Sequence, residues 1–360
     1  MMTQLDDGRR LAMSVGADSV AAGANSVGAN AERYVLRAGD YEALVLGMGA
    51  TLCSLTYRGR DLVLPFDPAV MRPDARGALL APWPNRIDAG KYEFGGREHQ
   101  LPINELLFNN TTHGLVMWQD FELVSRSESH VELTYVIAPQ PGYPWRVRVT
   151  SKFELDAEGL SQEVTATNLS EAGDSLGQGS APFGAAAHPY LLAGPVAERG
   201  LDEWSLRVDA ALVTENNARE IPQTDWPVAE FRDGLFDFRA PRTVGETIIN
   251  NAFTGLARDE RGFARVEVWV SSAGSAGGGA AGDVSAGEDA VSGSGVAIEF
   301  DERCPWVQVY THDYPETGPG RAGLAVEPMT CPANAFNSGT DVVVIAPGES
   351  ASAGWRILAL

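Results

Sequence analysis

The sequence predicts an all-β fold of stacked antiparallel sheets with few or no helices. From about Tyr34 onward, short apolar segments are separated by glycine, proline, asparagine and aspartate, as in strands joined by turns. We find no convincing amphipathic helix of roughly ten residues or more. A parallel sheet needs helices on both faces, so antiparallel pairing is expected. Such a fold can form one domain of well over ~200 residues.

The clearest strand is predicted over Trp145–Leu155. Its alternate residues are suited to burial, and a period of two is typical of a half-buried antiparallel strand. The residues of this face are Trp145, Val147, Val149, Ser151, Phe153 and Leu155. Val131–Tyr135 predicts the strand before it, and the Pro139–Pro144 segment predicts the turn between the two.

Further strands are predicted in the second half of the chain by the same alternation. They are expected over Trp204–Val208, Ala264–Val270, Val296–Phe300, Trp306–Tyr310, Val342–Ile345 and Trp355–Leu360, with a Pro347–Gly348 turn between the last two.

Residues 31–360 are expected to form a single domain, preceded by a disordered N-terminal tail over residues 1–30 that makes a poor signal peptide. Residues 271–295 are almost entirely glycine, alanine, serine and acidic residues, between two predicted strands. This composition buries too little apolar surface to offset its conformational entropy, so we expect an expanded, disordered hairpin loop. A phosphate-binding loop would need the pattern G-x-x-x-x-G-K, which this segment lacks.

The composition restricts the partners. The chain has 360 residues with a formal net charge of −21, which repels nucleic-acid phosphates and anionic lipids. We therefore expect no nucleic-acid or membrane partner. No apolar run approaches the ~20 residues that span a bilayer, and a cytoplasmic location is expected. Cys53, Cys304 and Cys331 lack C-x-x-C spacing and predict buried, reduced thiols.

Three segments carry residues suited to acid–base chemistry. His113 lies in a polar, turn-rich loop, and His188 lies among small alanines before a proline that favours extended backbone. Glu327 follows an apolar run and precedes Pro328, which predicts a strand end with a partly dry carboxylate. Burial raises the pKa of a carboxylate toward values useful for a general base. Taken alone, each residue is more often structural than catalytic.

The functional interpretation of these three segments is stronger because they occur together with other motifs and in a fixed order. In this they resemble the aldose 1-epimerase (galactose mutarotase) family, in particular its bacterial branch, over roughly residues 34–360. The motifs that carry the resemblance are Ala81-Pro-Trp-Pro-Asn-Arg-Ile87, Gly90-Lys-Tyr-Glu-Phe94, Leu101-Pro-Ile-Asn104, His113-Gly114 with Trp118, His188-Pro-Tyr190, Phe236-Asp-Phe-Arg239, Val309-Tyr-Thr311 and Val326-Glu-Pro-Met-Thr-Cys331.

The resemblance implies a β-supersandwich fold with an open cleft that uses no cofactor and no metal. It assigns the general base to Glu327 and the general acid to His188. It also implies that His113, Arg86, Asn85 and Gln308 bind sugar hydroxyls.

The activity implied is an isomerase reaction, the interconversion of the α and β anomers of a free aldohexose such as glucose or galactose. The base removes the proton of the anomeric O1 hydroxyl while the acid protonates the ring oxygen O5. The ring opens, the C1–C2 bond rotates, and closure on the other carbonyl face gives the other anomer. We expect the base and the acid on opposite sides of the sugar ring.

One position departs from the family pattern. The family usually has an aspartate that contacts sugar hydroxyls where this chain has Asn250, in Ile249-Asn-Asn-Ala-Phe253. An amide both donates and accepts hydrogen bonds, so we expect weaker and less selective sugar binding than with aspartate. In the alternative interpretation Asn250 is a solvent-facing turn residue, and Asn251 or Asp237 binds the sugar.

Other functions also fit these residues. A hexose-phosphate 1-epimerase on the same fold would need additional cations at the cleft rim. A non-catalytic sugar-binding protein is a third interpretation, against which the presence of both Glu327 and His188 argues. The paired carboxylates of a glycosidase are not recognisable in the sequence. A monomer and a homodimer are both compatible with the sequence.

Overall fold

A computed structural model describes residues 32–171, 179–270, 294–313 and 319–360. Within them the chain is built almost entirely of antiparallel strands, which confirms the predicted all-β class. The helices of this part are one short α-helix, α1 (Ala335–Ser338), and the 3-10 helices η1 (Gly200–Glu203) and η2 (Phe231–Gly234). Among these residues, no helix combines the length and apolar character that crossing a membrane requires.

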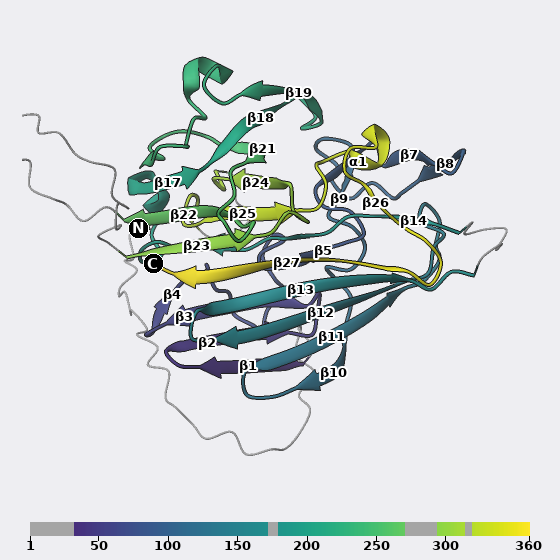
Figure 1. Ribbon diagram of the computed structural model, residues 1–360, viewed down its shortest axis with the longest axis horizontal. Coiled ribbons are helices and arrows are strands. Elements are labelled where there is room, and N and C mark those ends of the chain that lie inside the picture. Colours follow the sequence, from purple (N-terminus) through teal and green to yellow (C-terminus); the bar gives the residue numbers. More distant parts are fainter. Residues whose placement is uncertain (1–31, 172–178, 271–293, 314–318) are drawn as a thin grey trace, which may run out of the picture.

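A nine-stranded antiparallel sheet extends from β10 in the lower part of Figure 1 to β22 and β17 near its middle. Its strands, in spatial order, are β10 (Glu122–Arg126), β11 (His130–Ile137), β12 (Val147–Asp156), β13 (Gly159–Asn168), β27 (Ser350–Ala359), β23 (Gly295–Phe300), β22 (Ala264–Val270), β17 (Trp204–Val208) and β20 (Arg242–Thr243).

An eight-stranded sheet, whose β18 and β21 lie in the upper part of Figure 1, is the second layer. Its strands, in spatial order, are β19 (Pro222–Pro227), β18 (Ala210–Asn216), β21 (Asn250–Leu256), β24 (Trp306–Tyr310), β25 (Leu324–Met329), β15 (Ala186–Ala187) and β5 (Leu79–Leu80), with β16 (Tyr190–Leu191) also paired to β25.

Smaller sheets complete the fold. One has four strands, β1 (Arg33–Ala38), β2 (Tyr41–Leu46), β3 (Thr51–Tyr57) and β4 (Arg60–Asp61); the two-stranded ones pair β6 (Arg86–Asp88) with β9 (Asn110–Thr112), β7 (Lys91–Phe94) with β8 (Arg97–Gln100), and β14 (Ala181–Phe183) with β26 (Val343–Ile345).

The period-two pattern explains how the layers join. Every second residue of β12 is buried, which confirms the face predicted from Val147 to Leu155. One continuous apolar cluster includes Val149 and Val266 of the nine-stranded sheet and Val307 and Val326 of the eight-stranded sheet. The inner faces of both sheets therefore form the core, and the other face of the eight-stranded sheet carries a smaller apolar cluster that includes Trp306 and Met329.

Most predicted strands are confirmed, with shifts at their ends. Trp145 and Leu360 lie just outside β12 and β27, and β27 starts earlier, at Ser350. Gly295, expected in the low-complexity loop, is the first residue of β23 and pairs with Trp269. Residues 271–293 of that loop, and the N-terminal tail, lie outside the described residues. The three cysteines are buried free thiols, as predicted.

Candidate active site

Glu327 lies inside β25 rather than at a strand end, so that expectation was wrong. It pairs in register with Gln308 of β24, and its side chain is buried. Pro328, which suggested the end of a strand, lies where the neighbouring strand is interrupted between β15 and β16. Val326 N donates to Pro189 O at 3.1 Å and Thr330 N donates to Ala185 O at 3.0 Å. Pro328, between them, has no N–H to donate, so the ladder opens between β15 and β16.

His188 occupies this opening. Its carbonyl oxygen accepts a hydrogen bond from Gly77 N at 2.8 Å, which fixes the backbone. Its Nε2 lies 3.3 Å from Oε1 of Glu327, and both side chains are buried. The acid and the base predicted from the sequence are therefore side by side, not on opposite sides of a ring-sized gap.

Burial sets the protonation of this pair. It raises the pKa of Glu327 to about 8, although the positive charge of Arg86 lowers this pKa by a smaller amount. It lowers the pKa of His188 to about 4, which Asp74 partly opposes. Between these pH values the pair holds one proton. Oε2 of Glu327 is buried and accepts no hydrogen bond from the described residues, so a substrate hydroxyl could satisfy it.

His113 reaches the pair from a tightly constrained loop. Its backbone φ is 63°, and its N–H donates to Asn85 O at 2.9 Å. A Cβ at Gly114, whose φ is 72°, would overlap the Ala81 carbonyl, so this position requires glycine. The His113 ring meets the His188 ring edge-on with centroids 5.4 Å apart. Burial lowers the pKa of His113 well below its usual value, which keeps the ring neutral.

Arg86, in β6, is held by a carboxylate that the sequence did not reveal. Its Nε and Nη2 donate to Glu105 at 2.9 and 2.7 Å, a two-point ion pair. Its Nη1 donates to Oδ1 of Asn85 at 3.3 Å, which brings the two predicted sugar-binding residues into contact. The guanidinium keeps unused N–H groups, since Glu105 takes one side of its fork.

Gln308 and Asn250 are also brought together. Nε2 of Gln308 donates to Oδ1 of Asn250 at 2.9 Å, and Gln308 lies opposite Glu327 in the sheet. Asn250 is in β21 and not in a solvent-facing turn.

The alternative residues lie elsewhere. Asn251 donates to the backbone oxygen of Thr214 at 2.8 Å, within the sheet. Asp237 is paired with Arg239 at 2.7 Å and lines a shallow surface hollow formed by residues 237 and 239–242. Neither has a recorded contact with the His188–Glu327 pair.

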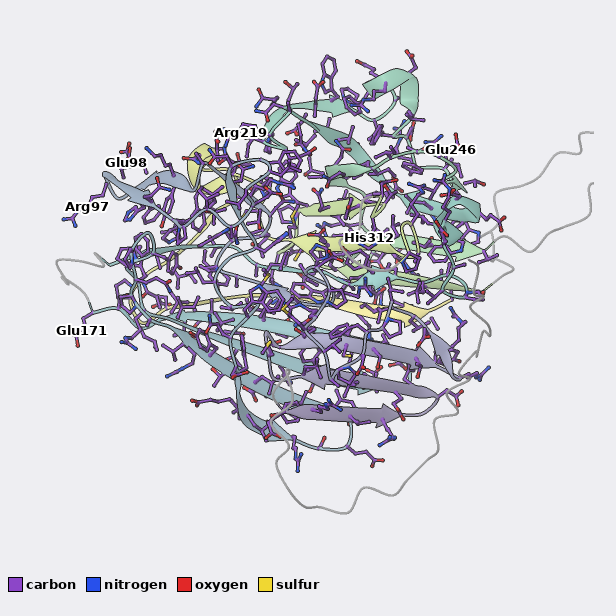
Figure 2. The ribbon with its side chains drawn as sticks, turned by 180° about the vertical axis from the view of Figure 1, so that it is seen from behind. Arg97, Glu98, Glu171, Arg219, Glu246 and His312 are labelled. Carbon is purple, nitrogen blue, oxygen red and sulfur yellow. The ribbon has the colours of Figure 1, made fainter. Side chains whose placement is uncertain are left out.

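A second layer of side chains supports His188 and was missed from the sequence. Tyr190 stacks on the His188 ring at 5.3 Å, and the ring of His312 meets Tyr190 at 4.9 Å. Nε2 of His312 lies 3.3 Å from Asp74. Figure 2 shows His312 near the middle of the molecule. Tyr190 belongs to the His188-Pro-Tyr190 motif, but its contact with His188 forms only in the fold, and no local pattern marks His312 or Asp74. Within the described ranges, no group of three or more His, Cys, Asp or Glu is placed to hold a metal ion.

Comparisons with known proteins identify the family and the fold. The family model for aldose 1-epimerase matches residues 32–357. The uncharacterized protein YihR of Escherichia coli K12 is 33% identical over 315 residues, covering 87% of this chain and 89% of that protein. A GalM/aldose epimerase homologue from C. elegans has a similar structure, with TM-score 0.71 and 18% identity, covering 91% of this chain and 99% of its own. A galactose mutarotase-like protein from Clostridium acetobutylicum gives TM-score 0.70 and 18% identity, covering 91% and 94%. These two structures confirm the fold.

Proposed function

The chain belongs to the aldose 1-epimerase family, and we propose that it interconverts the α and β anomers of a free aldohexose. The observation that carries the proposal is the buried pair of Glu327 and His188, with Nε2 and Oε1 3.3 Å apart. The pair shares one proton at neutral pH, as a reaction that removes one proton and supplies another requires.

The side-by-side geometry suits the chemistry better than the opposite-sided one expected from the sequence. The anomeric O1 and the ring O5 are bonded to the same carbon, so neighbouring groups can address both. The pKa shifts place the shared proton on Glu327 beside a neutral His188. Transfer of this proton to Nε2 of His188 gives the form that reacts, a carboxylate beside a protonated histidine. Glu327 takes the proton of O1, and Nε2 of His188 gives a proton to O5 as the C1–O5 bond breaks. After rotation about C1–C2, ring closure returns both protons and restores the pair.

We place the sugar over small side chains. Ala252, Ala325 and Ala186 lie on the same sheet face as Glu327, and their short side chains project little from it. Gln308 and Asn250 are hydrogen-bonded to each other on this face, His113 contacts His188, and Arg86 contacts Asn85. We assign the hydroxyls of the sugar to these residues. Trp306 and Met329 close the apolar end of the same face.

The cations next to the pair are already engaged, which favours a neutral sugar over a hexose phosphate. Arg86 is bound by Glu105 at 2.7 Å. Arg72 is only 2% exposed, donates to Thr51 Oγ1 at 2.7 Å, and has Trp118 over its guanidinium at 4.3 Å. The charge of each is therefore already partly balanced or enclosed within the protein, which disfavours binding of a phosphate dianion.

Polarimetry on freshly dissolved α-glucose and α-galactose tests the proposal. The wild-type protein should accelerate the approach to the equilibrium rotation, and His188→Asn should slow the catalysed rate by at least about 10²-fold. Acceleration only with hexose phosphates would support the phosphorylated alternative. Saturable sugar binding by calorimetry without acceleration would show a non-catalytic sugar-binding protein.

A further inference from the structure

A carboxylate lies next to the residue where the family aspartate is missing. Oε2 of Glu220 accepts hydrogen bonds from Nδ2 of Asn250 at 3.4 Å and from Nδ2 of Asn216 at 3.3 Å. Glu220 comes from the loop between β18 and β19, about thirty residues before Asn250 in the chain. The negative charge absent from β21 is thus present, supplied by another element.

The loop holds Glu220 in place. Its φ is 59°, in the left-handed region that a glutamate rarely adopts. The next residue back, Arg219, donates to Phe108 O at 3.0 Å and pairs with Asp88 at 2.6 Å. Figure 2 shows Arg219 close to the upper margin of the molecule. These contacts fasten the loop to the segment that carries Glu105, the partner of Arg86.

The hydrogen bonds of Asn250 are used within the protein. Its Oδ1 accepts from Gln308 at 2.9 Å and its Nδ2 donates to Glu220 at 3.4 Å. Asn250 therefore connects the carboxylate of Glu220 to Gln308, which lies opposite Glu327. Oε1 of Glu220 accepts no hydrogen bond from the described part of the chain, and the side chain is only half-buried.

We propose that Glu220 binds hydroxyls of the sugar and determines which aldose is preferred, in place of the missing aspartate. The inference rests on the proposed function, since it needs a sugar over the face of Glu327. Asn250 then acts as a positioning residue that orients the carboxylate.

The proposal changes what Asn250→Asp should do. On its own, Asn250 suggested that an aspartate would bind sugar more tightly. With Glu220 in contact, Asn250→Asp puts two carboxylates together and removes the amide that holds Glu220. The single variant should therefore bind no better than wild type, whereas Glu220→Gln with Asn250→Asp should restore a lone carboxylate.

Kinetics of Glu220→Gln test the proposal, with Glu215→Gln as the matched control. Glu215 lies in the same hairpin, where its carboxylate accepts from Trp226 Nε1 at 2.9 Å, so the control removes the same charge. For the best hexose, Glu220→Gln should raise KM about tenfold, as expected for one charged hydrogen bond, with kcat within about twofold. The control should change neither. The double variant Glu220→Gln/Asn250→Asp should recover part of the KM.

Deoxyhexoses separate binding from a structural effect. Removing the hydroxyl that Glu220 binds should raise KM in wild type but not further in Glu220→Gln. An unchanged KM in Glu220→Gln would overturn the proposal. So would an increase in KM that is the same in wild type and in Glu220→Gln for every deoxyhexose. A wild-type protein that fails to accelerate mutarotation of any aldose would instead refute the proposed function itself.

Discussion

Replacing Glu327 with glutamine removes the proposed base and, at the same time, a carboxyl group that is costly to ionise. Burial raises the pKa of Glu327 from 4.5 to about 8 in the folded protein. A raised pKa in the folded state means that stability is complete below pH 4.5 and decreases as the pH rises to about 8. At about 1.4 kcal/mol per pKa unit, the carboxylate costs roughly 5 kcal/mol at alkaline pH.

Glu327→Gln escapes this cost, because an amide does not ionise. The variant should lose catalysed mutarotation by at least about 10²-fold. Its melting temperature relative to wild type should increase by several degrees between pH 5 and pH 9. Polarimetry at pH 7 and thermal denaturation across this range measure the two effects.

Glu299 provides the control for burial alone. Its carboxylate is also buried but is paired with Arg261 at 3.2 Å. Glu299→Gln, which removes a buried carboxylate of the nine-stranded sheet, should keep normal activity. Near-normal turnover of Glu327→Gln would refute its role as base, and a melting-temperature difference independent of pH would refute its burial in a dry site.

The remaining predictions concern the proton, the arginine and the low-complexity segment. Because the His188–Glu327 pair holds one proton between about pH 4 and pH 8, kcat/KM should be flat in that range and fall on both sides; a step centred near pH 6.5 would contradict this. Glu105→Gln should raise KM several-fold by releasing Arg86, and an unchanged KM would show that the ion pair does not orient it. Replacing residues 271–293 with Asn-Gly should preserve fold and activity, because Val270 N donates to Ser294 O at 3.0 Å and the strand ends already meet; failure to fold would disprove the loop interpretation.

Local patterns in the sequence were sufficient for the strands, and the candidate site residues were proposed from the resemblance to the family. The alternation from Val147 to Leu155 depends only on neighbouring residues, so β12 could be predicted. His188, His113 and Arg86 were found because each lies in a motif of the family. Glu105 and Glu220 were missed, since loop residues acquire their roles from partners far along the chain and no periodicity marks them.

The misplacement of Glu327 shows how topology overrides a local rule. A proline after an apolar run predicts the end of a strand, because proline cannot donate to the ladder. In β25 the strand continues, since the neighbour on that side is itself interrupted between β15 and β16 and no acceptor needs the missing N–H. Pro189 and Pro328 bound the same opening, and His188 and Glu327 are the side chains that meet there. The local rule fails at the acid–base pair because both prolines keep the ladder from closing over it.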